Sequence, residues 1–397
     1  MKKILSLALL GATTSLFALY AEHASLYKDP RIMGMGGANV ASGGYSTSVF
    51  SNPAGLAQIK KERGLVVDLL SIGAAYSPDG QEFVDDLNDV ETDSDVNPNA
   101  STDLTNVLKK YSGEPFHIGL NNYTSVSKNS DAFAWSIGLL AATEFNFMPH
   151  AEGGSQGLLA TSSRAYGGIV VGVAKPYALS FGRLDVGMGV KYITQQSYEG
   201  ALDINDLLTS GDEDISDTLQ DKYEKKNSGI GVDLGVTYHP FPDGFWNMAF
   251  GLSVLNIGSL DMGNDYGGQP MTVNIGASIS PKISFLSHFT LAVDYVDLLE
   301  ENKLRMYDGT AADVEYSDYD DSDLMKRLRI GASLGLFDNA FITTTLNAGL
   351  YQGSYTAGLD FHLTLLRLTA ATYEEQIGSG DIDIADRRYM GQISISW

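Results

Sequence analysis

Residues 230–238 read Ile-Gly-Val-Asp-Leu-Gly-Val-Thr-Tyr, an unbroken alternation of large apolar side chains with small or polar ones. Successive side chains of a β-strand point to opposite faces of the sheet, whereas a helix repeats every ~3.6 residues. The stretch therefore predicts a strand with one apolar face and one polar face.

The same alternation recurs along most of the chain. It is clear in 184–192, 246–254, 271–279, 289–295, 328–336 and 355–363, and weaker in 64–76, 115–126, 132–147, 160–174, 340–351 and 366–376. Together with residues 387–397, these stretches predict an all-β chain of about fourteen strands, an even number that suits a closed bacterial barrel.

Two classes of β protein could carry this pattern, and the polar face separates them. A soluble sandwich or propeller turns its apolar face into a core and its polar face into water. Here the polar face is mainly Gly, Ser, Thr, Asn and single charges, while Tyr and Trp gather at strand ends. That arrangement is typical of a lipid-facing band around a wet interior. We expect a closed antiparallel transmembrane β-barrel, because lipid forbids an open sheet edge.

The links between these strands alternate between long and short. Long, mostly acidic links are expected at 77–114, 148–159, 199–227, 258–269, 299–323 and 377–386, with the tight turn Gln352-Gly353 as the exception. The short links, such as 127–130, 239–244 and 338–339, are rich in turn residues. Long loops of outer-membrane barrels face outward, so we expect extracellular acidic loops and both chain ends on the periplasmic side.

The first residues are typical of an export signal. Lys2 and Lys3 precede an apolar stretch, and Ala21 offers a small residue for cleavage, so residues 1–21 are expected to be removed. No other apolar run reaches the roughly 20 residues that a membrane-spanning helix requires. Because the chain has no cysteine, neither a lipid anchor on cysteine nor a disulfide is expected. The predicted location is the bacterial outer membrane, whose lipid would surround the barrel.

Composition argues against several function classes. The formal net charge of −23, from 26 basic and 49 acidic side chains, disfavours nucleic acid as a partner because phosphate binding needs clustered Lys and Arg. The six histidines are scattered, so a zinc site is not expected. Gly-x-Gly stretches lie inside predicted strands, not at phosphate loops, and no Ser/His/Asp triad stands out. We expect no cofactor, no catalytic residue and no enzymatic activity.

Residues 31–57 interrupt the alternation. Six glycines and Pro53 allow a tight, irregular backbone here and do not suit a regular ladder. Such backbone is tolerated at membrane depth only inside protein or a wet lumen, and a barrel of this size has room for a plug. The sequence predicts a hatch at 22–60 inside the lumen and a barrel at 61–397. The expected hatch residues are Gly34, Gly36, Gly37, Asn52, Pro53 and Ala54.

Charged side chains on the polar faces should point into the lumen, because Arg or Lys facing lipid at the midplane would cost roughly 2–4 kcal/mol each. Two interpretations are open. The charges pair across the lumen and with the hatch, or Lys191, Arg327 and Arg329 contact a ligand such as a carboxylate. Phe145 and Phe147 either line an apolar entrance site or belong to the aromatic girdle. The full inward set is Asp185, Lys191, Asp233, Asp294, Arg327, Arg329, Asp360, His362 and Arg367.

Two short motifs resemble a known family. Gly34-Met35-Gly36-Gly37-Ala38 followed by Ser51-Asn52-Pro53-Ala54-Gly55-Leu56 is similar to the N-terminal hatch of the FadL/TodX superfamily, whose signature is the Asn-Pro-Ala turn. Its members are fourteen-stranded outer-membrane barrels that pass long-chain fatty acids or aromatic hydrocarbons. The resemblance implies a non-catalytic channel for passive uptake of a hydrophobic or amphipathic small molecule.

Other segments extend the resemblance. The last strand, with Tyr389, Ile393, Ile395 and Trp397 on one face, resembles the signal that the barrel-insertion machinery recognises, which implies that machinery as a partner. Segments 77–89, 372–378 and 386–389 are similar to conjugal-transfer TraF-like proteins, and PorV-type barrels, which serve secretion, are a further relative. These likenesses imply an alternative function: a non-transporting envelope protein for conjugation or secretion that docks partners through acidic external loops.

Overall fold

The computed structural model describes residues 22–397 except 79, 92–95, 131, 155–156, 210–219, 261, 263–267, 303, 309–314, 320–322, 340 and 378–383. The expected export signal, residues 1–21, lies outside the described residues. None of the helices in the described ranges is long and apolar enough to cross a membrane.

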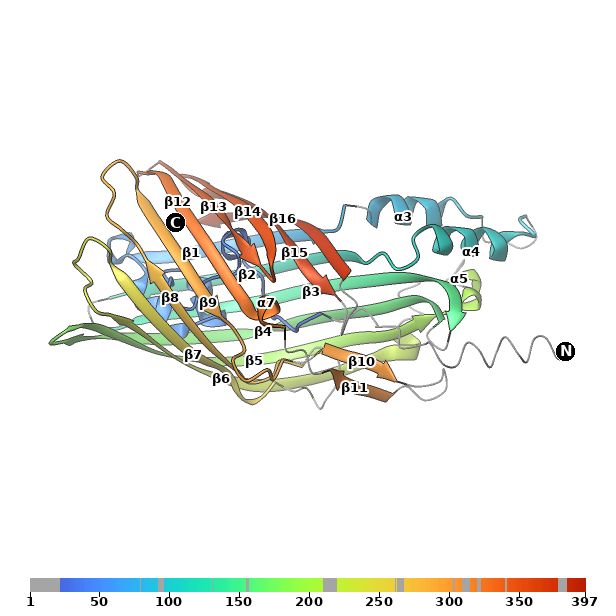
Figure 1. The fold of residues 1–397 in the computed structure, drawn as a ribbon, viewed down its shortest axis with the longest axis horizontal. Helices are drawn as coiled ribbons and strands as arrows, with labels where there is room; N and C mark the ends of the chain where they lie inside the picture. Colours follow the sequence, from blue (N-terminus) through green and yellow to red (C-terminus); the bar gives the residue numbers. More distant parts are fainter. Residues whose placement is uncertain are drawn as a thin grey trace.

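Fourteen antiparallel strands close into one barrel, as the alternation predicts (Figure 1). The ring closes where β1 pairs with β16, from Asp68 opposite Ser396 to Tyr76 opposite Tyr389. Closure leaves no free edge whose unpaired N–H and C=O groups would face lipid. The strands are β1 (Leu65–Tyr76), β2 (Phe116–Asn129), β3 (Ala134–Gly154), β4 (Gly157–Leu179), β5 (Gly182–Leu202), β6 (Glu224–His239), β7 (Met248–Ser259), β8 (Thr272–Ile279), β9 (His288–Tyr295), β12 (Leu328–Asp338), β13 (Ile342–Tyr351), β14 (Ser354–Leu363), β15 (Leu366–Ile377) and β16 (Ile384–Ser396).

The two faces of the wall match the predicted division. In β6, Ile230 and Leu234 are 57% and 47% exposed, whereas Asp233 and Thr237 are fully buried. Eight of the nine charged residues expected in the lumen lie on the inner face of the strands, and the ninth, Arg327, is buried just before β12 begins. The exposed apolar side chains form an outer surface of the kind that faces lipid in membrane barrels. On other strands this surface includes Met188, Leu252, Ile275 and Leu359.

An arginine in place of Leu234 should cost about 2–4 kcal/mol of folding free energy, because this side chain lies in the middle of the apolar outer face of β6. Ser228→Arg, on the same face but beyond the apolar band, is the matched control and should cost about 0–1 kcal/mol. Urea unfolding of the barrel in lipid vesicles measures both values. Equal costs would contradict a lipid-facing surface on β6.

Three neighbouring strands are much longer than a membrane requires. β3, β4 and β5 have 21, 23 and 21 residues, against about 9–11 for a tilted transmembrane strand. Their ends project beyond the rim that carries the long links, and β3 stays paired with β4 as far as Gly154 opposite Gly157. The prediction of a loop at 148–159 is therefore wrong, since the described part of this range is strand.

Short helices cover the outer face of this projection (Figure 1). They are α3 (Gly80–Asn88), α4 (Ala100–Lys110) and α5 (Ile204–Thr209). The ring of Phe83 on α3 stacks on Phe116 of β2 with 4.7 Å between centroids, and α4 packs against β3. Hydrogen bonds from Lys110 and Tyr111 join α4 to α3 and lower the pKa of Asp86. Burial under these helices explains why the strands continue into water.

The link after β9 also has structure of its own. It contains a two-stranded sheet of β10 (Leu304–Asp308) and β11 (Glu315–Tyr319), and the helical turn α7 (Leu324–Arg327) leads into β12. The predicted turn at Gln352-Gly353 is confirmed: both residues have positive φ, 50° and 83°, as a tight hairpin turn of type I′ requires.

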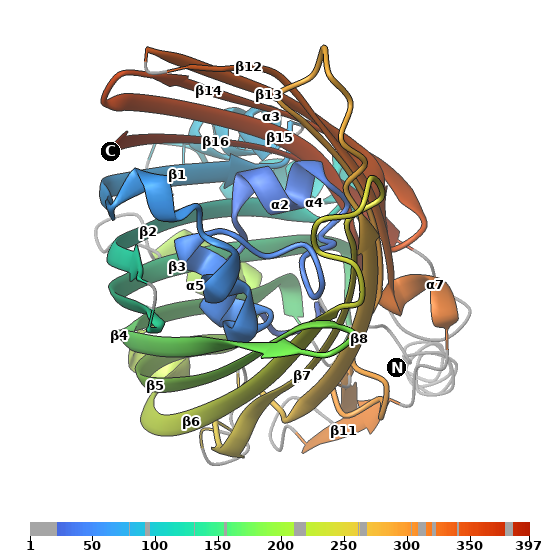
Figure 2. The same cartoon turned by 90° about the vertical axis from the view of Figure 1, so that its left-hand side faces the viewer.

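The N-terminal segment (residues 22–64) runs inside the ring of strands (Figure 2). It holds α2 (Pro30–Gly34) and three short 3-10 helices, η2 (Ser46–Phe50), η3 (Pro53–Gln58) and η4 (Lys61–Arg63). Asp29 and Asn52 cap α2 and η3, because each side chain accepts a hydrogen bond from the backbone N–H two residues ahead. α2 packs against β13 to β16 and η3 against β4 to β6, so the segment crosses the lumen from wall to wall.

Candidate functional site

Glycines on the inner wall let the N-terminal segment touch the strands backbone to backbone. A Cβ added to Gly34 would lie 2.7 Å from Cα of Gly358 on β14, far inside van der Waals contact. A Cβ on Gly187 of β5 would overlap the backbone nitrogen of Ala54, and one on Gly235 of β6 would overlap the side-chain oxygen of Asn52. Only glycine at these wall positions allows this seat.

Polar contacts lock the two predicted hatch motifs in place. The Asn52 amide donates to the carbonyl oxygens of Val40 at 2.7 Å and Val236 at 3.2 Å, and its oxygen accepts from the Ala54 N–H. At the other motif, Thr356 of β14 accepts from the Gly36 N–H and donates to the Gly34 carbonyl. Gly36 and Gly37 have φ of 65° and 77°, which favours glycine there. These residues thus fix the segment to the wall, and movement as a hatch stays a prediction.

Asp294 of β9 is a further anchor. Its carboxylate is fully buried and accepts hydrogen bonds from the backbone N–H groups of Asn39 at 2.6 Å and Val40 at 2.7 Å. The sequence placed this residue in the lumen but gave no partner for it.

Asp294→Ala should therefore loosen residues 38–42. Two backbone N–H groups would lose a charged acceptor, each worth about 1.5–3 kcal/mol. We expect amide hydrogen exchange at Asn39 and Val40 to accelerate at least ~10-fold, the response to ~1.4 kcal/mol. Asp360→Ala is the control, since Asp360 pairs with Arg367 within the wall. If both variants exchange alike at residues 38–42, Asp294 is no anchor.

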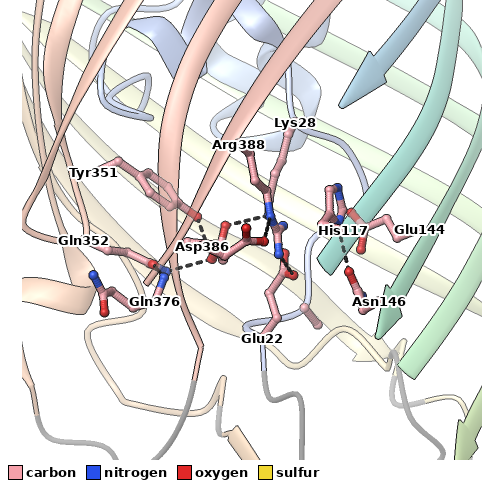
Figure 3. A network of polar contacts seen from close by, with 12 residues as sticks. Glu22, Lys28, His117, Glu144, Asn146, Tyr351, Gln352, Gln376, Asp386 and Arg388 are labelled. Carbon is pink, nitrogen blue, oxygen red and sulfur yellow. Dashed lines mark hydrogen bonds and ion pairs between the residues drawn. The ribbon is translucent and has the colours of Figure 1, made fainter. Parts of the chain in front are cut away.

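A buried set of charges, the lumen ion cluster, joins the start of the described chain to one side of the barrel wall, from β15 through β16 to β4 (Figure 3). Glu22 contacts Arg388 of β16 at 2.9 Å, Arg164 of β4 at 3.8 Å and Lys28 at 2.5 Å. Lys28 also contacts Glu375 of β15 at 2.8 Å. The members are Glu22, Glu144, Glu375 and Asp386 as carboxylates, with Lys28, Arg164 and Arg388 as cations.

Neutral groups add hydrogen bonds around this cluster. Ser77 donates to Asp386 at 2.6 Å, and Gln352 donates to Glu375 at 2.9 Å. His117 contacts the Asn146 amide oxygen at 2.7 Å. Ion pairs and hydrogen bonds of this kind reduce the cost of burying ionised groups in a lumen.

The described chain starts in the half of the lumen that faces the long links. Arg388, the partner of Glu22, lies near the start of β16, whereas Trp397 pairs with Val67 near the start of β1, at the short-turn rim. From there the described segment passes through the lumen to β1. That both chain ends are periplasmic stays a prediction.

The predicted lumen residues Lys191, Arg327 and Arg329 meet at one cavity of about 230 Å³. It lies between the N-terminal segment and the walls formed by β5, β7, β8, β12 and β13. Two further cations, Lys28 and Lys326, line it. Its apolar lining includes Leu26, Ile32, Met33, Val40, Phe50 and Leu255, and its acidic lining is Asp29 and Asp297.

The cations of this cavity differ in their partners. Lys191 contacts Asp233 at 3.0 Å, and Arg327 contacts Asp297 at 3.5 Å. Arg329 is buried, donates to the carbonyl oxygens of Lys326 and Leu328, and stacks over the Tyr351 ring at 4.0 Å. Within the described residues, Arg329 forms no ion pair with a carboxylate. Most inward charges are therefore paired, whereas Arg329 contacts backbone carbonyl oxygens and the Tyr351 ring.

Phe145 and Phe147 lie outside the lumen. Phe145 is 39% exposed on the outer face of β3, in line with Ile137 and Leu139. Phe147, on the same face, packs in the apolar cluster beneath α3, α4 and α5. Both residues lie an even number of positions after the exposed Ile137 and Leu139 on β3, so the alternation in the sequence already predicts that they face outward. An entrance site built on them would therefore lie on the outer wall.

No metal centre is evident in the ranges that the structure describes, because no three His, Asp or Glu side chains there come close enough to share an ion.

Several solved structures share this fold. The TodX monoaromatic hydrocarbon channel in a deltaS2 mutant has a TM-score of 0.54 at 10% identity, covering 93% of this chain and 98% of that one. Its deltaS2S3 mutant has a TM-score of 0.53 at 11% identity, covering 94% of this chain and 99% of that one. The Ralstonia pickettii toluene transporter TbuX has a TM-score of 0.50 at 13% identity, covering 94% of this chain and 98% of that one. At such identities the likeness establishes the fold.

The fold defines the class: a closed fourteen-stranded antiparallel β-barrel with an N-terminal segment in its lumen, the fold that the hydrocarbon channel and the toluene transporter share. Within it, a family model described as "F plasmid transfer operon, TraF, protein" matches residues 49–295, and the chain belongs to that family. A search of curated proteins gave no match.

Proposed function

We propose that this chain is a passive outer-membrane channel for a small amphipathic molecule with an anionic group, and that it has no catalytic role. The observation that carries the proposal is the lumen cavity, which combines an apolar lining with the buried cation Arg329. Solved structures of the same fold include hydrocarbon channels and a toluene transporter, which supports transport of a small ligand.

In this scheme residues 1–21 are an export signal, residues 22–60 a hatch and residues 61–397 the barrel. A ligand lands among the long links, binds in the cavity, and passes when the hatch shifts. The cavity of about 230 Å³ is below the roughly 300–1,000 Å³ of common ligand pockets. A compact ligand, such as a monoaromatic acid, is therefore favoured over a long chain.

Membrane insertion is proposed to follow the pattern of other outer-membrane barrels. The outward side chains of β16, Tyr389, Ile393, Ile395 and Trp397, are all exposed and would be available to the assembly machinery before lipid covers them. The acidic long links would then be extracellular and the short turns periplasmic.

Arg329→Gln tests the proposed ligand site. It removes the charge and keeps hydrogen-bond donors, so benzoate binding to the detergent-solubilised barrel should weaken about 10–100-fold, as loss of ~1.4–2.8 kcal/mol predicts. Toluene binding should change little. Equilibrium dialysis of both probes gives the values, and Arg387→Gln on the outer face is the matched control. If the unaltered protein does not bind benzoate, or Arg329→Gln binds it equally well, the anion site is excluded.

The family supports a second candidate function, that of an envelope protein that serves plasmid transfer. The projecting strands with α3 and α4 would then be the docking surface. Removing α3 and α4 (residues 80–110) should reduce plasmid transfer between cells and leave benzoate uptake unchanged if docking is the function. The opposite pattern would favour the channel.

A further inference from the structure

Aromatic side chains crowd the short-turn rim, the end of the barrel that carries the short links. Phe181 in the turn between β4 and β5 and Phe285 between β8 and β9 are each 82% exposed, the highest values among the large apolar side chains of the described residues. Other exposed aromatic residues on this rim are Phe133, Phe241, Phe341 and Trp397. A set of exposed apolar side chains of this size marks a surface that meets a partner or lipid.

The same rim reverses the charge balance of the chain. The whole sequence has 26 basic and 49 acidic side chains, whereas the short links and the residues beside them have seven Lys or Arg against four Asp or Glu. These segments are 60–64, 128–133, 175–183, 239–247, 280–288, 338–342 and 363–366. Because cations outnumber carboxylates here, this rim suits a negatively charged partner.

Two lysines lie at the lower edge of the apolar outer face. Lys128 of β2 and Lys175 of β4 are exposed, and each follows an outward-facing valine, Val126 or Val173, by two residues. The Lys175 ammonium lies 5.2 Å from the centre of the Tyr177 ring, the next outward side chain of β4. Long lysine stems can lie along apolar surface in this way while the charged head stays at the polar boundary.

The strand register brings these cations to one arc of the rim. Lys128 lies opposite Leu65 of β1 and opposite Trp135 of β3. Arg63 is exposed two residues before Leu65, and Lys175 extends β4 beyond the pair that joins it to the start of β3. In the part of the chain that the structure describes, Lys128, Lys175 and Arg63 form no ion pair. Their charges are therefore available to an external anion.

We propose that the short-turn rim binds anionic phospholipid headgroups, with Lys128, Lys175 and Arg63 at the phosphates and the exposed aromatic side chains in the interfacial layer beside them. Lys and Arg near an anionic membrane surface attract it, and aromatic rings lie at headgroup level. A lipid surface fits this rim better than a protein partner, because the aromatic side chains project from turn after turn around the ring and the lysines border the apolar outer face.

This binding would fix the depth of the barrel in the membrane and give its two ends different lipid preferences. The acidic long links at the other end repel the headgroups that the short-turn rim attracts. The effect does not depend on whether the barrel transports a ligand.

The tryptophans of the chain provide a local probe. The three of them, Trp135, Trp246 and Trp397, all lie at the short-turn rim. Quenching of their fluorescence by brominated phosphatidylglycerol or brominated phosphatidylcholine, in vesicles of equal parts of the two lipids, gives the relative association constant there. At low salt phosphatidylglycerol should be preferred at least ~5-fold, the contribution of one cation near an anionic surface. In about 1 M salt, where the Debye length falls to ~3 Å, the preference should disappear.

A double variant tests the two outward lysines. Lys128→Gln with Lys175→Gln keeps polar side chains at both positions, removes their charges, and should lower the preference for phosphatidylglycerol to less than about twofold. Lys109→Gln with Lys226→Gln is the matched control, since both lysines are exposed at the end of the barrel that carries the long links. This control should leave the preference unchanged. Folding of each variant is checked by the heat-dependent gel shift of barrels.

Equal association of the two lipids with the unaltered barrel would overturn the proposal. So would a preference that survives high salt, or the same loss of preference in both double variants. If the Lys128 and Lys175 variant does not fold, the salt dependence of the unaltered protein decides.

Discussion

Gly187→Ala should unseat the N-terminal segment from the barrel wall and open the lumen to ions. The added Cβ would lie 2.7 Å from Cα of Ala54 and would overlap the Ala54 nitrogen. β5 is held by full ladders to β4 and β6, so the wall cannot retreat and η3 must move. Overpacking here should destabilise the seated position of the N-terminal segment by about 1–3 kcal/mol. The fraction of molecules in which the segment has left the wall would then rise about 5–150-fold.

Conductance of single barrels in planar lipid bilayers measures this effect, and the time spent in conducting states should rise by the same factor. Gly189→Ala is the matched control, because Gly189 has the same strand and face but its nearest neighbour is the flexible side chain of Asp233, 3.0 Å from the added Cβ. If the two variants conduct alike, the contact of Gly187 with Ala54 does not keep the lumen closed.

The wall of the barrel could be predicted because a strand assigns its faces from its own sequence. Lys191 on β5 and Asp233 on β6 alternate with apolar residues that face outward. This alternation alone places both side chains in the lumen, whatever lies on the neighbouring strands. The ends of the strands could not be predicted in this way. β3 continues past 148 because α4, some forty residues earlier in the chain, covers its outer face.

The candidate site was predictable only in part for a related reason. The alternation of faces predicts that Arg327 and Arg329 point into the lumen. That they line one cavity with Lys191 depends on the strand register around the ring and on the N-terminal segment inside it. The lumen ion cluster joins Glu22 to Arg164 and Arg388, residues with no sequence relation to each other. The sequence did indicate the position of Glu375. It lies an even number of residues after Arg367 on β15, so both side chains are on the inner face.

Replacing Arg388 by methionine should destabilise the barrel more than any other single charge removal discussed above. Its guanidinium lies 2.6 Å from Asp386 and 2.9 Å from Glu22, and its side chain is fully buried. Methionine fills much of the same volume but leaves both carboxylates without this cation. Breaking a buried ion pair in this way costs about 3–5 kcal/mol.

Arg387→Met provides the comparison from the adjacent residue. Arg387 faces outward, pairs with Glu374 at 2.9 Å and keeps part of its side chain in solvent, so its loss should cost roughly 1 kcal/mol or less. Urea unfolding in lipid vesicles at neutral pH measures both. The Arg388→Met deficit should shrink as the pH falls towards ~4, since a protonated carboxyl no longer needs a cation. A deficit that is independent of pH would indicate lost packing and not an unpaired charge.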